Sequence, residues 1–297
     1  MKDKIVITGA TGFVGSNLVK HMLKKGFKIS IIIRKNSDLS NLEGVINKIK
    51  IFNYDNDIAR LGVFLKSFKP KLVFHLASNF IAEHKTEQVD SLIESNVTFG
   101  LHLLEAMKIA GVRNLINTGT SWQHYNNEEY NPVCLYAATK KAFESLIEYY
   151  IKAENFKVIT LKLFDTYGET DTRPKLINLL NKFANDNSEL KMSLGDQKLN
   201  LVHIIDVCKA YHIAYGLNMN KDSNVHQIYS IKGNESFKLK EVISIFEMVT
   251  NKKINILWGS RNYRKREVMN LWDKGIKLPK WKTSITLEEG LSRYKND

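Results

Sequence analysis

The stretch Thr8-Gly9-Ala10-Thr11-Gly12-Phe13-Val14-Gly15 decides the fold class, because it joins a predicted strand to a predicted helix. The run before it, Lys4–Thr8, is rich in β-branched residues, and the segment after it has apolar residues at the spacing of one helix face. Glycines allow a tight turn and let a pyrophosphate approach the helix N-terminus, where free N–H groups favour anions. The pattern predicts a dinucleotide-binding loop formed by Gly9, Thr11, Gly12, Phe13, Val14 and Gly15. A plain glycine-rich turn is the alternative.

The rest of the first half alternates short apolar runs with helical patterns. Further strands are predicted at Ile29–Ile33, Ile49–Phe52, Leu72–Leu76, Leu115–Thr118 and Val158–Leu163. Continuous apolar strands separated by helices indicate a parallel sheet covered on both faces. We therefore predict a doubly wound, Rossmann-type α/β domain over residues 1–165. A smaller α/β substrate lobe is expected over residues 166–297, with about residues 199–217 returning to the core. Thr286-Leu287-Glu288-Glu289 is typical of a capping box that begins a terminal helix.

Composition limits the class of protein. The chain has 297 residues, 43% hydrophobic and 25% charged, which fits one large domain or a core with an added lobe. No apolar run approaches the roughly 18–20 residues of a membrane span, and no signal peptide is recognisable. The two cysteines, Cys134 and Cys208, are too few for a disulfide framework, and the histidines form no metal-binding pattern. We expect a cytoplasmic protein with no membrane partner and no metal.

The net charge of +13 raises the question of nucleic-acid binding. The lysines are dispersed along the chain, and only Arg261, Arg264, Lys265 and Arg266 form a tight cluster. No zinc-finger spacing or RNP-type aromatic motif accompanies them. We therefore expect dispersed solubilising charge and no nucleic-acid partner.

The end of the second predicted strand indicates which dinucleotide is bound. A cation there accommodates a 2′-phosphate, and an acidic residue would bond the 2′-hydroxyl. The sequence has Arg34-Lys35, with Asp38 only later, so NADP(H) is favoured and NAD remains possible if these are solvated charges. Asp55, after the third strand, is placed to meet the adenine, although a turn aspartate fits equally.

Tyr136 and Lys140 are four residues apart, so a helix places both side chains on one face. A tyrosine with its ordinary pKa of about 10 exchanges protons poorly at neutral pH. A neighbouring ammonium favours the phenolate, and we therefore expect Lys140 to lower the pKa of Tyr136. The fifth predicted strand is followed by Thr120-Ser121, and ligands bind at the carboxyl ends of strands in such sheets.

In combination, these motifs resemble the extended short-chain dehydrogenase/reductase family, also called the NAD-dependent epimerase/dehydratase family, over nearly the whole chain. The resemblance implies that Thr120 holds the substrate oxygen, with Ser121 as the neighbouring alternative, and that Tyr136 exchanges the proton. It implies that Lys140 binds the nicotinamide ribose and that Asn96 supports the site through backbone or water. The strand end Leu76, Ala77 and Ser78 is implied to contact the cofactor.

The second half is similar to nucleotide-sugar enzymes, and its closing stretch Arg264–Met269 resembles the reductases of 4-keto-6-deoxy nucleotide sugars, such as CDP-paratose and CDP-abequose synthases. Arginine is suited to binding a diphosphate, so we expect Arg264, and after it Arg173, to bind the diphosphate of the substrate. The alternative role for Arg264 is an ion pair with Glu267. The aromatic loop that contains Trp122 and His124 is expected to contact the sugar.

Some residues depart from the family pattern. Leu199-Asn200 replaces an arginine-aspartate pair, Lys162 replaces a frequent arginine, and Asp165 replaces an asparagine. Ser121-Trp122 stands where 4,6-dehydratases carry an acidic pair, which argues against dehydration.

The resemblance thus implies an NAD(P)-dependent oxidoreductase that reduces a nucleotide-linked 4-keto-6-deoxy sugar at C4. A nucleotide-sugar 4-epimerase that retains NAD is the alternative. A non-catalytic regulatory or RNA-binding protein on the same fold is a distant third. A homodimer is expected, since the helices of Asn96 and Tyr136 often form a two-fold bundle in this family.

Overall fold

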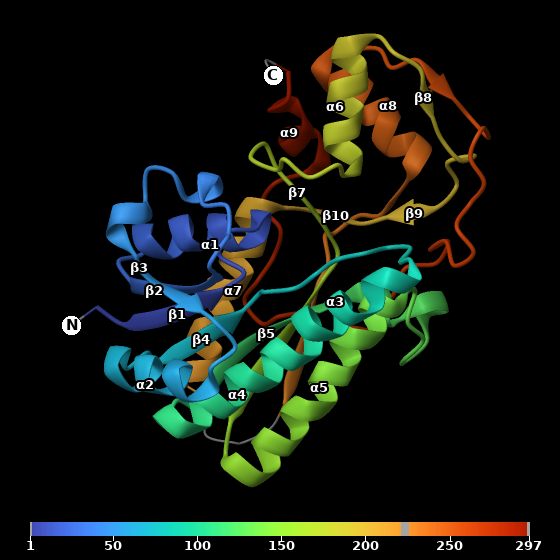
Figure 1. The fold of residues 1–297 in the computed structure, drawn as a ribbon. Coiled ribbons are helices and arrows are strands. Elements are labelled where there is room, and N and C mark those ends of the chain that lie inside the picture. Colours follow the sequence, from blue (N-terminus) through green and yellow to red (C-terminus); the bar gives the residue numbers. More distant parts are fainter. Residues whose placement is uncertain (1, 221–225, 296–297) are drawn as a thin grey trace.

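The computed structural model describes residues 2–220 and 226–295, and its centre is a seven-stranded sheet (Figure 1). The strand order is β11-β6-β5-β4-β1-β2-β3, and every pairing is parallel. The strands are β1 (Lys4–Thr8), β2 (Lys28–Arg34), β3 (Lys50–Tyr54), β4 (Leu72–His75), β5 (Asn114–Thr120), β6 (Lys157–Leu163) and β11 (Gln227–Ile231). The chain order reverses between β1 and β4, which is where such sheets bind ligands. The six predicted strands and the doubly wound fold class are confirmed.

The seventh strand, β11, has no counterpart among the strands predicted from the sequence. It pairs with β6 at the edge of the sheet, from Gln227 opposite Ile159 to Ile231 opposite Leu163. Its run of residues is short and mixes polar with apolar side chains, so its place depends on the pairing with β6 and not on local preference.

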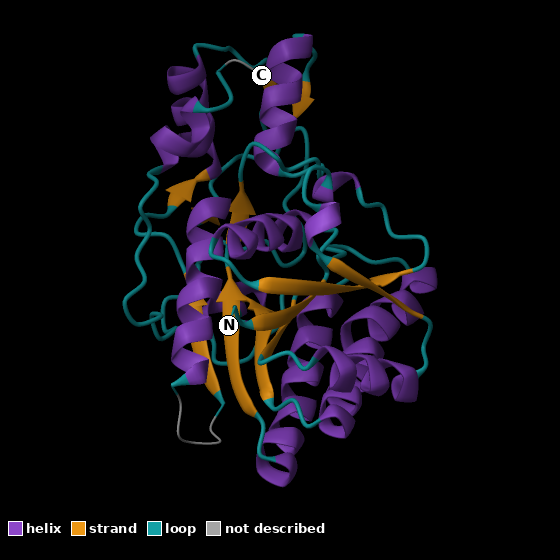
Figure 2. Cartoon of the chain, turned by 90° about the vertical axis from the view of Figure 1, so that its left-hand side faces the viewer, coloured by secondary structure: helices purple, strands orange, loops and turns teal. Residues whose placement is uncertain are grey.

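Helices cover both faces of the sheet (Figures 1 and 2). The helices α1 (Phe13–Lys24) and α7 (Ile204–Met219) share one apolar core with Ile5 and Ile7 of β1. The helices α2 (Ile58–Phe68), α4 (Phe99–Ala110) and α5 (Leu135–Glu154) share a second core with Val6. Successive strand residues point to opposite faces, which is why one strand supplies both cores.

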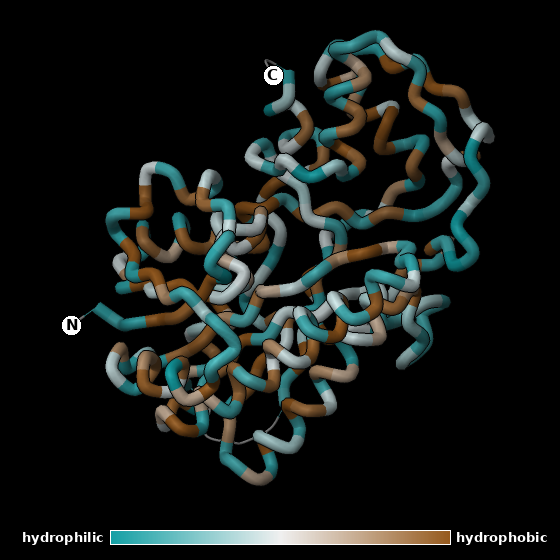
Figure 3. The backbone as a smooth tube through the Cα atoms, in the orientation of Figure 1, coloured by the Kyte–Doolittle hydropathy of each residue, from teal (hydrophilic) through white to brown (hydrophobic). Residues whose placement is uncertain are grey.

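A third core lies in a lobe above the carboxyl ends of the strands. It is formed mainly by α6 (Leu176–Asp186), α8 (Leu239–Thr250) and α9 (Leu287–Ser292). Short strands accompany them: β7 (Asp165–Tyr167), β8 (Leu190–Lys191), β9 (Lys198–Leu199), β10 (Leu201–His203), β12 (Phe237–Lys238) and β13 (Ile256–Leu257). Thr286 and Glu289 form the predicted capping box at the start of α9. Figure 3 shows hydrophobic segments concentrated in the interior of the sheet region and of the lobe.

Between these two parts the chain crosses more than once. After β6 it enters the lobe, α7 returns to pack on the sheet beside α1, and β11 then joins the sheet edge. The division at residues 165 and 166 stays a prediction. A short helix α3 (Val89–Ile93) and several 3-10 turns complete the fold. Within residues 2–220 and 226–295, no helix combines the length and apolar character needed to cross a membrane.

Candidate active site

The glycine-rich loop lies between β1 and α1, and two of its glycines have no room for a side chain. Gly9 has a φ of 67°, and a Cβ there would lie 2.5 Å from the amide nitrogen of Ala77. A Cβ on Gly15 would lie 2.0 Å from the carbonyl oxygen of Gly9. Helix α1 begins after Gly12 without a side-chain cap from any described residue, so its first N–H groups remain open. This backbone fits the pyrophosphate of a dinucleotide.

The end of β4 is fixed against this loop by Thr8. Its hydroxyl lies 2.9 Å from Nδ1 of His75 and accepts hydrogen bonds from the amides of Leu76 and Ala77, each at 3.2 Å. His75 is fully buried, and burial lowers its pKa to about 3. The neutral His75 is therefore a core residue, and the Thr8 hydroxyl holds the chain after β4 beside the cofactor loop.

Asn96 lies on a π-helical turn, Glu94–Thr98, and is almost fully buried. Its Oδ1 accepts hydrogen bonds from the Ser78 hydroxyl at 3.0 Å and the Asn79 amide at 2.7 Å. Its Nδ2 donates to the Asn79 carbonyl and to the Thr139 hydroxyl, each at 3.0 Å. Asn96 thus ties the segment after β4 to α5, which gives it a supporting position beside the site.

Lys140 is 1% exposed, and its ammonium has no hydrogen-bond partner among the described residues. Burial lowers the pKa of Lys140 to about 8, while the Glu144 carboxylate acts in the opposite direction. A buried ammonium without a partner is costly, so its presence indicates a polar ligand group such as the hydroxyls of a cofactor ribose. The buried, unpartnered Lys140 and the open glycine loop together fit a nicotinamide dinucleotide.

Tyr136 is one helical turn before Lys140 on α5. Burial raises the pKa of Tyr136 to about 12, whereas a hydrogen bond to Ser78 and the charge of Arg173 act to lower it. The predicted lowering by Lys140 is not found, because removal of the phenol from water outweighs the charges nearby. Tyr136 is therefore protonated at neutral pH in this structure and is placed to donate its proton.

Thr120 ends β5, and its hydroxyl accepts a hydrogen bond from the Trp122 amide at 3.3 Å. A threonine hydroxyl still has its own proton to donate, so Thr120 can offer it to a substrate oxygen. Gln123 completes a capping box with Thr120, and its side-chain amide donates to the buried Glu144 at 3.0 Å. These bonds hold Thr120 in place opposite α5.

His124 contacts its neighbours through both ring nitrogens. Nδ1 lies 3.0 Å from the Glu128 carbonyl, and Nε2 lies 2.8 Å from Nζ of Lys162. Burial and the charge of Lys162 lower the pKa of His124 to about 4, so the neutral ring donates from Nδ1 and accepts at Nε2. The ring is stacked on Trp272 at a centroid distance of 3.9 Å. His124 therefore has only ring carbon surface to offer a sugar.

Three of the cations that line the pocket, Arg264, Arg173 and Lys175, also pack on aromatic rings; Lys191, Lys198 and Arg261 line it too. Arg264 is ion-paired with Glu267 at 2.6 Å and lies over the ring of Trp122, with its guanidinium carbon 5.1 Å from the ring centroid. The pairing that was the alternative role for Arg264 is thus present, in a residue that also lines the pocket. Arg173 is paired with Asp171 at 2.7 Å and lies over the ring of Phe13, with its guanidinium carbon 4.7 Å from the centroid.

Lys175, the third cation, was not predicted from the sequence. Its ammonium lies 3.6 Å from the ring centroid of Phe80, which itself packs edge-on against Tyr136. Among the described residues Lys175 has no carboxylate within ion-pairing distance. A single lysine before a helix gives no local signal, so only the tertiary contact reveals it.

One pocket of about 1200 Å³ joins these features. Pockets for a single drug-sized ligand are about 300–1,000 Å³, so this one has room for more than one such ligand. Its walls include the predicted residues Gly9, Gly12, Phe13, Val14, Gly15, Leu76, Ser78, Thr120, Ser121, Trp122, His124, Tyr136, Lys140, Arg173 and Arg264. The predicted residues Thr11, Arg34, Asp55, Ala77 and Asn96 are not among its lining.

Arg34 and Asp55 lie at the ends of β2 and β3. Arg34 is exposed, and its guanidinium has no ion pair among the described residues. Asp38 is engaged in hydrogen bonds from Ser40. Asp55 is ion-paired with Arg60. Of these charged side chains at the ends of β2 and β3, the one without a partner among the described residues is therefore the cationic Arg34.

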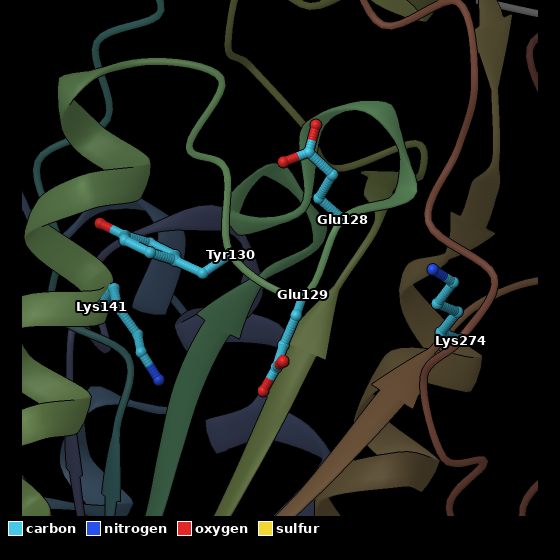
Figure 4. Close-up of a pocket in the computed structure, with 5 residues that line it drawn as sticks. All are labelled: Glu128, Glu129, Tyr130, Lys141 and Lys274. Atoms are coloured by element: carbon cyan, nitrogen blue, oxygen red, sulfur yellow. The ribbon is translucent and has the colours of Figure 1, made fainter.

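A second pocket, of about 590 Å³, lies between α5, the loop before it and the C-terminal segment, and contains none of the predicted site residues (Figure 4). Its walls are Glu128, Glu129, Tyr130, Lys141 and Lys274. Within the described parts of the chain, no group of three or more histidine, cysteine or acidic side chains is arranged to hold a metal ion.

Comparison with known proteins places this site in a family. Residues 5–231 match the family described as NAD dependent epimerase/dehydratase. The chain is 27% identical over 267 residues to a CDP-abequose synthase of Yersinia pseudotuberculosis, covering 90% of each chain. It is 26% identical to a UDP-glucuronate 4-epimerase of Thermodesulfobacterium geofontis, covering 98% of this chain and 94% of that protein. The fold is that of a UDP-glucose 4-epimerase from Thermotoga maritima solved with UDP-glucose, with a TM-score of 0.84 at 19% identity over 99% and 97% of the two chains.

Proposed function

The chain belongs to the NAD dependent epimerase/dehydratase family, and we propose that it reduces a nucleotide-linked 4-keto-6-deoxy sugar at C4. One observation carries this proposal: a single pocket contains the glycine loop, Tyr136 with Lys140, and a group of cations beyond them. A dinucleotide and a nucleotide sugar could then lie end to end with the sugar at Tyr136. The similarity to a CDP-abequose synthase along 90% of both chains supports a reductase.

The chemistry assigned to this chain is proton donation and orientation, while a bound nicotinamide dinucleotide would supply the hydride. Tyr136, protonated at neutral pH, would donate its proton to the carbonyl oxygen as negative charge develops there. Thr120 would donate a hydrogen bond to the same oxygen. Lys140 would hold the ribose hydroxyls with its otherwise unpartnered ammonium. Ser121 and Trp122 offer no carboxyl group for a dehydration.

A reductase and an epimerase differ in the first proton transfer at Tyr136. Reduction begins with a proton donor, whereas a 4-epimerase must first remove a proton from the substrate hydroxyl. Tyr136 can serve in either role, so the preference for a reductase rests on the similarity to a CDP-abequose synthase. A retained-NAD 4-epimerase stays the second candidate, since a relative of 26% identity carries that name.

We propose NADP(H) as the cofactor, with Arg34 contacting the 2′-phosphate. Arg34 is exposed at the end of β2, where that phosphate would lie, and it has no ion pair among the described residues. Asp38, the nearest acidic residue after β2, is engaged by Ser40. Beyond Tyr136, we propose that Arg264, Arg173 and Lys175 hold the substrate diphosphate.

A homodimer and a cytoplasmic location remain parts of the proposal. Exposed Ile93 on α3 and Tyr149 on α5 supply apolar surface on helices that could pair with a second copy. Light scattering of the purified chain would give its mass in solution.

The test of the proposed function is direct. The purified protein is first examined by mass spectrometry for copurifying dinucleotide, and then given a CDP-linked 4-keto-6-deoxy sugar with NADPH. We expect little retained NAD, one NADPH oxidised per sugar, and a single C4 alcohol in the NMR spectrum. Tightly retained NAD, with interconversion of C4 epimers and no net NADPH oxidation, would instead establish the epimerase.

A further inference from the structure

Asp165 occupies an unexpected place for a carboxylate, because it lines the pocket where an anionic diphosphate is proposed to bind. It begins β7, and its amide donates to the Asn200 carbonyl at 3.1 Å, which fixes the backbone beside β10. Burial raises the pKa of Asp165, while Lys175, Arg264 and Arg173 lower it and Glu267 adds to the rise. The titratable groups that face it are therefore these three cations and Glu267, with Asp171 behind Arg173 and the Cys134 thiol near Arg264 and Lys175.

The cations Arg173, Lys175 and Arg264 are equal in number to the carboxylates Asp171, Asp165 and Glu267, although Lys191, Lys198 and Arg261 also line the pocket. Arg173 is matched by Asp171, and Arg264 is matched by Glu267. Lys175 and Asp165 are not within ion-pairing distance, but each charge shifts the pKa of the other group toward its ionised form. A doubly charged diphosphate held by Arg173, Lys175 and Arg264 would bring a local excess of negative charge close to these carboxylates in a partly buried place, where the interaction is poorly screened.

Protonation of a carboxylate relieves such an excess, and Asp165 is the carboxylate best placed for it. Asp171 and Glu267 each hold an arginine through short hydrogen bonds, so protonating either one would release a guanidinium. Asp165 makes no such bond to an arginine among the described residues. A protonated Asp165 would also offer an O–H group to a phosphate oxygen, which the carboxylate cannot do.

We propose that Asp165 couples binding of the substrate diphosphate to the uptake of one proton from solvent. The inference rests on the proposed function, because it takes the cluster of Arg173, Lys175 and Arg264 as the diphosphate site. Through this coupling, Asp165 would respond to the charge of the ligand. The affinity for nucleotide sugars would then depend on pH.

The pH dependence has a definite sign. Between the pKa of Asp165 in the free protein and its higher value in the complex, binding takes up a proton, so affinity falls as pH rises, by up to about tenfold per unit. Below the lower value Asp165 is already protonated, and above the higher value it stays ionised in both states. Affinity is then independent of pH at either end.

Isothermal titration calorimetry of the NADPH-bound protein tests the coupling. CDP-glucose, UDP-glucose and dTDP-glucose serve as product-like probes, titrated between about pH 6 and pH 9 in buffers of different ionisation enthalpy. The wild type is expected to take up about one proton in part of this range, and Asp165→Asn about none, with tighter binding than the wild type at the alkaline end. Asp196→Asn is the charge-matched control, because Asp196 is paired with Lys238 and Lys240 outside the cluster; it should keep the proton uptake.

The outcomes separate this inference from the function on which it rests. If a nucleotide sugar binds the wild type without proton uptake across the range, or if Asp165→Asn takes up as many protons as the wild type, the coupling is wrong and the reductase proposal stands. If none of the three probes binds the wild type at any pH, the proposed function fails and the inference fails with it.

Discussion

Replacing Lys140 by methionine should stabilise the cofactor-free protein while impairing cofactor binding. The side chain is 1% exposed, and no described residue hydrogen-bonds its ammonium. Its pKa is lowered from 10.5 to about 8. A gap of about 2.5 units at about 1.4 kcal/mol per unit means that holding the charge at neutral pH costs the folded state about 3 kcal/mol. Methionine fills a similar volume without a charge, and Glu144 keeps its contacts with Lys141, Lys162 and Gln123.

The pH dependence identifies the cause. Between about pH 8 and 10.5 the unfolded chain binds more protons at Lys140 than the folded one, so the stability of the wild type should rise with pH across that window. Lys140→Met lacks this titrating group. The difference between its free energy of unfolding and that of the wild type should therefore be largest near pH 7 and shrink toward pH 10. For a chain of this length, about 3 kcal/mol corresponds to a rise in Tm of about 5 °C.

The assay is thermal unfolding of the cofactor-free proteins at several pH values, repeated with NADPH. Lys141→Met is the matched control on the same helix, since Lys141 is partly exposed and should show a smaller effect with no comparable pH trend. NADPH should raise the Tm of the wild type and of Lys141→Met, but should raise that of Lys140→Met much less. A cofactor-free Lys140→Met that is less stable than the wild type at pH 7, or a stability difference independent of pH, would refute the reasoning.

Three further predictions concern catalysis and ligand choice. Tyr136→Phe should keep the fold and NADPH affinity but lower kcat by about 10²–10⁴-fold, the usual contribution of acid–base catalysis; kcat equal to that of the wild type would remove Tyr136 from the reaction. Arg34→Ala should narrow the preference for NADPH over NADH by about 1–3 kcal/mol, measured as the ratio of dissociation constants, whereas equal affinities in the unmutated protein would contradict the cofactor assignment. Arg264→Ala should raise the KM for the nucleotide sugar by about 10–100-fold, as expected for a lost hydrogen bond to a charged group, with little change in NADPH binding. Unchanged sugar kinetics together with weaker, less salt-dependent polyanion binding would point to nucleic acid instead.

The departures from the family pattern have different consequences in the structure. Asn200, which stands in place of an acidic residue, is fully buried and binds the backbone of Gly233 and Glu235, so its role is to hold a loop. Lys162 is bonded to His124 and lies near Glu144. Asp165 lines the pocket, as do Leu199, Ser121 and Trp122, and it is the departure among these four that brings a charged group there.

The sequence by itself determined the features that depend on neighbours along the chain. The strands β1 to β6 follow from runs of β-branched and apolar residues, and the cofactor loop follows from glycines between a strand and a helix. Tyr136 and Lys140 were found for the same reason, because a spacing of four on a helix is a local fact.

Tertiary structure alone decided how these groups behave. Burial, which sequence does not show, raises the pKa of Tyr136 where a neighbouring lysine predicted the reverse. Packing joins β11 to the sheet and engages both ring nitrogens of His124. The cluster of charges around Asp165 exists only because β7, the segment before α6 and the C-terminal chain meet at one wall of the pocket. Desolvation and pairing depend on what surrounds a group in space, and residues far apart in the sequence supply those surroundings.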